Sequence, residues 1–238
     1  MITAKITSRV SGPVLGVLLL PIYAVSANAE GAADVEISAN VALTTNYIFR
    51  GISQTDDGPA IQGGFDAGIE MFYAGVWASS VDFGDDTTME IDVYAGISPE
   101  FNGTTFDFGV LYYAYPDSPD LATGSQDFVE IYGGVSREFN QVSLGISAAY
   151  SPDFYGETGG GFYLRGDAGF QVAENISISG HYGLSTFEDN LLNDDYSDYS
   201  IGGTLSAAGL DFDLRYHGTA DMAAGDSDAV VLTVSKEF

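Results

Sequence analysis

Residues 35–50 read VEISANVALTTNYIFR, and their odd positions are mainly apolar while their even positions are mainly polar. A period of two is the signature of a β-strand with one apolar and one polar face. Strands of soluble proteins average five or six residues, whereas a tilted strand that crosses a bilayer needs about nine to eleven. The stretch therefore predicts one long strand, from Val35 to Arg50, of the length that a membrane barrel uses.

The same alternation recurs along the chain. It is clear near residues 61–70, 89–97, 106–113, 142–148, 162–171, 176–184, 210–217 and 230–238, and less clean near 72–81, 128–136 and 199–207. Parity, meaning whether a residue's number is odd or even, does not show which residues of the segment around Trp77 face the apolar side. The pattern predicts an all-β fold with about twelve antiparallel strands, an even number as in bacterial single-chain barrels.

The connections between these segments alternate in length. Longer polar loops are expected at 51–59, 82–87, 116–126, 151–160, 186–198 and 220–227, and short turns at sites such as Glu70-Met71, 137–140 and Ala173-Glu174. Long loops on one rim and short turns on the other are typical of transmembrane barrels, whose termini lie on the short side.

The N-terminal segment is typical of a secretory signal. Lys5 and Arg9 precede an apolar run from Val14 to Ala24, and small residues end at Ala29. The run is too short to span a bilayer as a helix. We therefore expect a signal peptide at 1–29 and a single barrel at 30–238, in the outer membrane of a Gram-negative bacterium.

The composition excludes several classes of function. The formal net charge is −27 at pH 7, and there is no cysteine. So acidic a chain does not attract nucleic acid, and it has neither disulfides nor thiolate sites. The sequence indicates no cofactor.

The last strand ends in Phe238, preceded at alternate positions by Val230, Leu232 and Val234. This resembles the signal by which the barrel assembly machinery recognises its clients, although Lys236 departs from the pattern. A soluble lipocalin-like barrel or sandwich would also alternate. Strand length, loop rhythm, Phe238 and aromatic residues near strand ends favour the membrane barrel. Those aromatic residues are Tyr47, Phe49, Tyr112, Phe162, Phe170 and Tyr216.

Three segments carry a family resemblance, namely LTTNYIFRGISQ at 43–54, GVWAS at 75–79 and EIDVYAG at 90–96. With them the chain resembles the proteobacterial Gcw_chp family, also labelled TorF-type porins, over essentially all of residues 30–238. The resemblance implies an outer-membrane barrel and a pore for small solutes.

Parity assigns a set of charged residues to the lumen. The predicted pore-lining residues are Glu36, Arg50, Asp66, Glu70, Glu90, Asp92, Asp107, Arg165, Asp167, Asp211, Asp213 and Arg215. The excess of carboxylates predicts a preference for cations if the lumen is open. Opposed Arg and Asp rows could instead pair and fill it, and Tyr94, Tyr113 and Tyr163 would narrow it further. A plugged structural or adhesive barrel therefore stays an alternative to a porin.

Two further sets of residues admit a weaker functional interpretation. Acidic loop pairs such as Asp56-Asp57, Asp85-Asp86 and Asp194-Asp195 are expected to be solvated, with Ca²⁺ or Mg²⁺ bridging to lipopolysaccharide as the alternative. A hydrolase would need His181 or His217 as its base, with His217 the better placed. No serine lies in a nucleophile-elbow context, and we expect no enzymatic activity.

Overall fold

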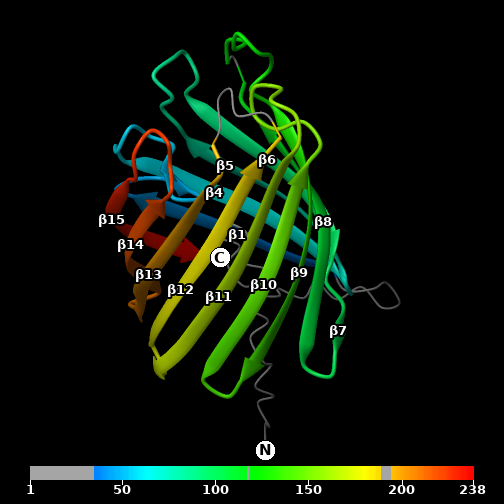
Figure 1. Ribbon diagram of the computed structural model, residues 1–238. Coiled ribbons are helices and arrows are strands. Elements are labelled where there is room, and N and C mark those ends of the chain that lie inside the picture. The colour runs from blue at the N-terminus through cyan, green and yellow to red at the C-terminus, as the bar shows by residue number, and fades with distance from the viewer. Residues whose placement is uncertain (1–34, 117, 189–193) are drawn as a thin grey trace, which may run out of the picture.

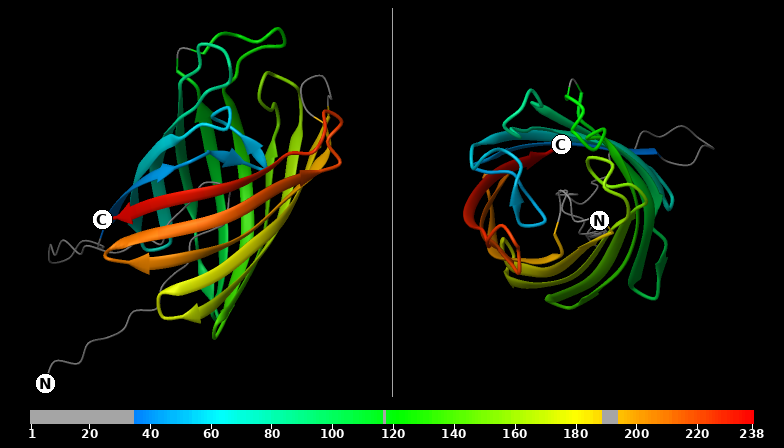
Figure 2. Two further views of the ribbon diagram at one scale, coloured as in Figure 1. Left: turned by 90° about the vertical axis from the view of Figure 1, so that its left-hand side faces the viewer. Right: turned by 45° about the horizontal axis from the view of Figure 1, so that its top comes forward.

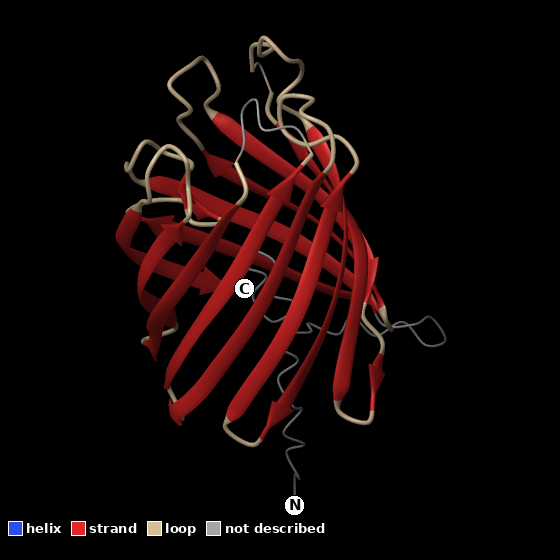
Figure 3. Ribbon diagram, in the orientation of Figure 1, coloured by secondary structure: helices blue, strands red, loops and turns tan. Residues whose placement is uncertain are grey.

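The computed structural model describes residues 35–116, 118–188 and 194–238. Within them, twelve antiparallel strands form one closed barrel (Figures 1 and 3), as the alternation predicted. The predicted signal peptide at 1–29 lies outside the described residues. The barrel strands are β1 (Val35–Thr44), β4 (Ala60–Ile69), β5 (Phe72–Ser80), β6 (Met89–Ile97), β8 (Thr104–Ala114), β9 (Phe128–Phe139), β10 (Val142–Ser151), β11 (Gly161–Ala173), β12 (Ile176–Phe187), β13 (Tyr196–Ala207), β14 (Leu210–Ala220) and β15 (Asp228–Glu237).

Neighbouring strands in the barrel are neighbours in the chain, and the ring closes where β1 pairs with β15. Three short strands lie outside this ring: β2 (Ile48–Phe49), β3 (Ile52–Ser53) and β7 (Glu100–Phe101). No helix among the described residues is long and apolar enough to span a bilayer.

The long connections all lie on one rim (Figure 3), and tight turns join the strands on the other. Four of these turns use a residue with positive φ, namely Glu70 (55°), Asn102 (51°), Asn140 (57°) and Ala208 (56°). Positive φ at the first turn position matches the right-handed twist of the flanking strands. The predicted loop asymmetry is confirmed, but Glu70 lies exposed in its turn and not on the lumen wall.

The outer face of the barrel is apolar. Each strand contributes at least one large exposed apolar side chain, while its alternate residues face inward. Such a surface is stable only in contact with hydrocarbon. Examples from the twelve strands in order are Leu43, Phe65, Val76, Val93, Phe108, Ile131, Ile146, Phe170, Leu184, Ile201, Leu214 and Val230.

The first strand is shorter than its alternation predicts. β1 ends at Thr44, whose hydroxyl donates a hydrogen bond to the carbonyl of Asn46 at 2.8 Å, and the chain then turns inward. Residues 45–59, which contain β2 and β3, form what we call the entry hairpin, and it lies in the mouth of the barrel (Figure 2). Tyr47 and Phe49 are therefore inside the barrel, and their assignment to the outer aromatic belt was wrong.

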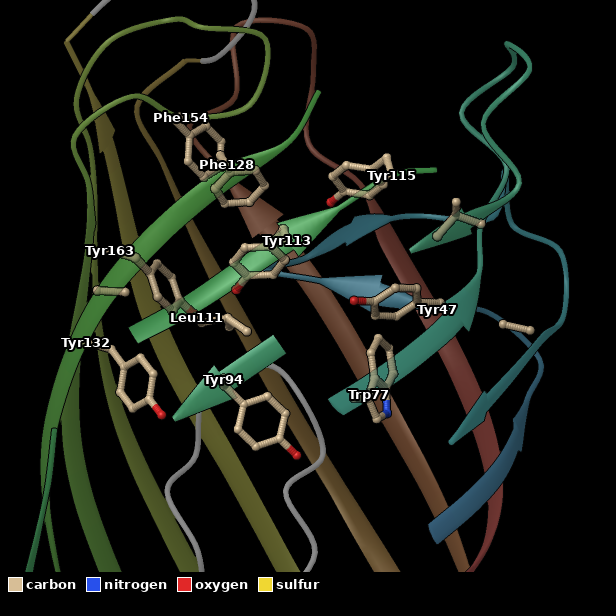
Figure 4. Packing of buried hydrophobic residues seen from close by; sticks show 13 residues of the cluster. Tyr47, Trp77, Tyr94, Leu111, Tyr113, Tyr115, Phe128, Tyr132, Phe154 and Tyr163 are labelled. Atoms are coloured by element: carbon tan, nitrogen blue, oxygen red, sulfur yellow. The ribbon is translucent and has the colours of Figure 1, made fainter. Parts of the chain in front are cut away.

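Aromatic side chains fill the lumen on the loop side. Tyr94, Tyr113 and Tyr163 point inward as predicted, and Trp77, which parity could not orient, is 4 % exposed and points inward too. Figure 4 shows these rings in one cluster with those of the entry hairpin. Other members of the aromatic cluster are Tyr47, Tyr115, Phe128, Tyr132 and Phe154. The core of this protein lies inside the barrel.

Candidate functional site in the barrel lumen

The entry hairpin is held by a buried ion pair. The Nη2 atom of Arg50 donates to both carboxylate oxygens of Glu130 on β9, at 2.7 and 2.8 Å. The guanidinium also lies over the rings of Phe49 and Tyr163, with 4.6 and 4.3 Å from its carbon to the ring centroids. Burial acts against the charge, but the Glu130 carboxylate outweighs it and raises the pKa of Arg50 above its ordinary value.

A second contact fixes the base of the hairpin. The Tyr47 hydroxyl donates to Oε1 of Glu90 on β6 at 2.7 Å, and its ring packs edge-on against Trp77 with centroids 5.5 Å apart. Asn46 and Thr55 are joined by a hydrogen bond of 3.1 Å across the hairpin. The hairpin is therefore anchored to the wall at two carboxylates, Glu90 and Glu130.

Further carboxylates line the lumen wall. Asp107 accepts a hydrogen bond from Tyr73 at 2.7 Å, and Asp66 accepts one from Tyr94. Asp92 is fully buried, and neither of its oxygens has a hydrogen-bond partner among the described residues. All three face the lumen, on the side that parity assigned to them.

The lumen wall also carries the other predicted residues. Arg165 pairs with Asp167 at 2.7 Å, and Arg215 pairs with Asp213 at 3.0 Å. In both pairs the partners are two residues apart on one strand, so they share its inner face. Asp211 accepts a hydrogen bond from Ser206, and Glu36 lies half-buried on β1. Arg50 is the exception, because it reaches the lumen from the hairpin and not from the wall.

Two carboxylates of the lumen were missed. Glu130 lies between the inward rings of Phe128 and Tyr132, which hide the alternation of β9. Asp198 fell in the predicted loop at 186–198, but β13 begins at Tyr196 and places Asp198 on the inner face. Extending the parity of β13 two residues upstream of Ser200 would have identified it.

Asp198 belongs to a chain of three polar side chains. Its Oδ1 lies 2.7 Å from Nε2 of His181, and Nδ1 of His181 lies 2.8 Å from the hydroxyl of Ser200. Ser200 is opposite His181 in one strand pairing and opposite His217 in the other. Sequence reasoning favoured His217 as the candidate base, whereas the structure places His181 beside a serine and a carboxylate.

An outer cavity of about 650 Å³ lies on the loop side of the entry hairpin. Its walls come from the hairpin and from five further loop-side connections with their strand ends. They include Phe49, Arg50, Asp56, Asp57, Asp82, Phe83, Tyr115, Phe128, Phe154, Tyr155, Phe187, Tyr196, Met222 and Asp228. We call this cavity the outer vestibule.

The loop acids make no metal centre in the described part of the chain, where no three His, Cys, Asp or Glu side chains converge on a possible ion position. Asp85 accepts hydrogen bonds from the Thr87 amide at 2.8 Å and from Gln126 at 2.9 Å. Slight burial acts to raise its pKa, but these hydrogen bonds prevail and hold the pKa of Asp85 below its ordinary value.

Comparisons with known proteins support the fold. No curated protein matches the sequence. An outer-membrane channel from Pseudomonas putida F1 matches with a TM-score of 0.51 and 10 % identity, over 88 % of this chain and 97 % of that one. OccK5 (OpdH) of Pseudomonas aeruginosa matches with a TM-score of 0.49 and 13 % identity, over 88 % and 68 % of the two chains. The family model described as "Bacterial protein of unknown function (Gcw_chp)" matches residues 28–237, and the chain therefore belongs to the Gcw_chp family.

Proposed function

We propose that this protein is an outer-membrane pore through which small solutes diffuse passively, with a preference for cations. The observation that carries the proposal is the charge of the lumen. Arg50, Arg165 and Arg215 are each neutralised by a carboxylate. Further inward carboxylates form no ion pair in the described part of the chain: Asp211 accepts a hydrogen bond from the Ser206 hydroxyl, and Glu36 lies half-buried on β1. The remaining negative charge attracts cations by direct Coulomb interaction.

The location follows from the outer surface. The apolar exterior fits a bilayer, and closed antiparallel barrels of this kind occupy the outer membrane of Gram-negative bacteria. Phe238 is 61 % exposed, and its backbone continues the pairing of β15 with β1 through a hydrogen bond to Ala39 at 2.9 Å. We infer that lipid and lipopolysaccharide surround the barrel, and that the barrel assembly machinery recognises its last strand.

The test is conductance of the refolded protein in planar bilayers under a salt gradient. Discrete channels with a reversal potential favouring cations support the proposal. A reversal potential favouring anions would contradict the argument from lumen charge.

A plugged structural barrel is the second candidate, and the packed aromatic cluster favours it. Tyr113 and Tyr163 are 2 % and 1 % exposed in the lumen on the loop side. The two functions separate experimentally, because a plugged barrel shows no channels either in the wild type or in a variant whose entry hairpin is released.

We infer that the protein is not an enzyme, despite the order of Ser200, His181 and Asp198. Ser200 is 5 % exposed and lies in the middle of β13, where no strained turn presents its hydroxyl to a substrate. Arg215 Nη1 lies 3.4 Å from that hydroxyl and links it to the polar wall. A fluorophosphonate probe that labels Ser200 would contradict this inference.

A further inference from the structure

The outer vestibule has the size of a ligand site. Its volume is about 650 Å³, within the range of roughly 300 to 1,000 Å³ that small-molecule sites occupy. The ion pairs of Arg165 and Arg215 do not extend into it, and neither do Ser200, His181 and Asp198. Its walls combine two kinds of side chain, namely aromatic rings and carboxylates.

The rings form a connected wall. Tyr196 and Phe187 have centroids 6.4 Å apart, Phe187 and Phe154 5.1 Å, and Phe154 and Phe128 4.7 Å. Phe83 and Tyr155 lie edge to face at 5.9 Å elsewhere on the cavity wall. Because each ring is held by its neighbours, the wall presents fixed aromatic surfaces to anything that enters.

Carboxylates line the same cavity. Asp56, Asp57, Asp82 and Asp228 line the vestibule, and none of them forms an ion pair with a base in the described part of the chain. Asp57 accepts a hydrogen bond from Asn46 at 2.9 Å, and Asp82 accepts one from the Gly84 amide at 3.1 Å. These neutral donors leave the negative charge in place.

Arg50, the one base among the described residues that line the vestibule, does not offset this charge. The Arg50 side chain is 6 % exposed, and its guanidinium contacts Glu130, Phe49 and Tyr163. Asp85, next to the vestibule, carries a pKa held below its ordinary value and adds another negative charge at neutral pH. The vestibule therefore has a net negative potential over an aromatic surface.

We propose that the outer vestibule binds organic cations that carry an apolar ring beside a positively charged nitrogen. A ring of this kind stacks on Phe154 and Phe187, and its cationic nitrogen meets both the aromatic faces and the carboxylates of Asp82 and Asp228. Anions are repelled by the same carboxylates, and neutral aromatic molecules gain only the stacking. The inference deepens the proposed function, because it names the class of solute captured at the outer mouth.

The experiment measures binding to the refolded protein in zwitterionic detergent by titration calorimetry. The probes are benzyltrimethylammonium, tetramethylammonium, benzyl alcohol and benzoate. We expect benzyltrimethylammonium to bind about tenfold more tightly than tetramethylammonium or benzyl alcohol, and benzoate to show no binding. Benzoate or benzyl alcohol binding as tightly as the aromatic cation would overturn the proposal.

Variants localise the site. Asp82→Asn combined with Asp228→Asn is expected to weaken benzyltrimethylammonium binding about tenfold, and Phe154→Leu to weaken it several-fold with little loss of volume. Asp120→Asn, an exposed loop acid outside the vestibule, is the matched control and leaves affinity unchanged. Equal affinities in the wild type and the double variant mean that the probe binds the micelle or another surface, and they refute the site.

The result of the binding experiment can be distinguished from the result of the conductance experiment on the pore. Calorimetry needs no ion flow, so binding without channels in bilayers would overturn the pore and leave the vestibule site standing. Channels in bilayers without binding in calorimetry would leave the pore standing and overturn the vestibule site. Heat-modifiable migration on gels confirms that each variant is folded before it is titrated.

Discussion

Replacing Glu130 by Gln should release the entry hairpin. The carboxylate accepts two hydrogen bonds from Arg50 and one from Tyr113 at 3.1 Å, and its side chain is 2 % exposed. Removing one partner of a buried ion pair leaves an uncompensated charge and destabilises by about 3–5 kcal/mol. Because Gln keeps a carbonyl that can accept one bond from Arg50, the lower end of about 3 kcal/mol applies.

This free energy converts into a population. At about 1.4 kcal/mol for each factor of ten, a loss of about 3 kcal/mol raises the released fraction of the hairpin roughly 100-fold. The variant keeps the hydrogen bond of Tyr47 to Glu90 and the contact of Phe49 with Tyr113, whose ring centroids lie 5.8 Å apart. Because these contacts still favour the docked hairpin, the released state stays a minority.

The rate of trypsin cleavage measures the released fraction of the hairpin directly, because Arg50 itself is the cleavage site. In the docked hairpin Arg50 is 8 % exposed and out of reach of a protease. Cleavage tracks the open population when opening and closing are fast. We expect the rate of cleavage between Arg50 and Gly51, followed by mass spectrometry of the new N-terminus, to rise roughly 100-fold in Glu130→Gln.

Asp213→Asn is the matched control, since it breaks the Arg215 pair without touching the hairpin. It should leave cleavage at Arg50 unchanged. A Glu130→Gln protein that is cut no faster than the wild type would refute the idea that this ion pair holds the hairpin in the mouth. Single-channel conductance of the same variant should increase, because the hairpin narrows the outer lumen.

Three further predictions concern packing, selectivity and pH. Gly109→Ala would place a Cβ 2.3 Å from the Tyr132 hydroxyl, so we expect it to destabilise the barrel by about 1–3 kcal/mol in urea unfolding, whereas Gly166→Ala, with no atom within 4 Å, should be neutral. Asp211→Asn removes a half-buried lumen carboxylate that forms no ion pair in the described part of the chain and should shift the reversal potential toward zero; an unchanged potential would mean that Asp211 contributes nothing to cation preference. The pKa of Asp85 lies below its ordinary value of 3.8, so the bonds from Thr87 and Gln126 stabilise the loop fully above that pH and are lost as pH falls through the folded pKa. Hydrogen exchange of the Thr87 amide should therefore stay slow from neutral pH down to about 4 and lose its protection only below, and Asp85→Asn should abolish that transition.

Much of the barrel could be predicted because each strand residue has only two environments. Ile37 and Leu43 face lipid while Ser38 and Thr44 face the lumen, so the sequence must alternate. The number of strands and the loop rhythm follow from this constraint alone.

The entry hairpin could not be predicted, because alternation continues past the end of the strand. Tyr47 and Phe49 keep the parity of β1, yet their partners are set by contacts far along the chain. The Tyr47 bond to Glu90 spans 43 residues, and the Arg50 bond to Glu130 spans 80. Parity records which face a residue takes and carries no information on which distant side chain it meets.

Glu130 on β9 escaped prediction for a related reason. An inward face that holds both rings and carboxylates, such as Phe128, Glu130 and Tyr132 on β9, shows no contrast with the apolar outward face. The alternation of apolar and polar residues that identifies a water-facing lumen wall is therefore weakest where that wall is packed with aromatic rings.

The seam between β1 and β15 has a consequence for how the barrel forms. Its register runs from Asn40 opposite Glu237 to Thr44 opposite Thr233, and the hydroxyls of Thr44 and Thr233 lie 3.0 Å apart across 189 residues of chain. Every other strand pairs with a neighbour close in sequence, so a sheet can grow by adding one hairpin at a time. Only the pairing of β1 with β15 requires both ends of the chain. Until it forms, the free edges of these two strands carry unpaired amides, which are unfavourable in hydrocarbon. Ring closure and membrane insertion are thus coupled in one late event.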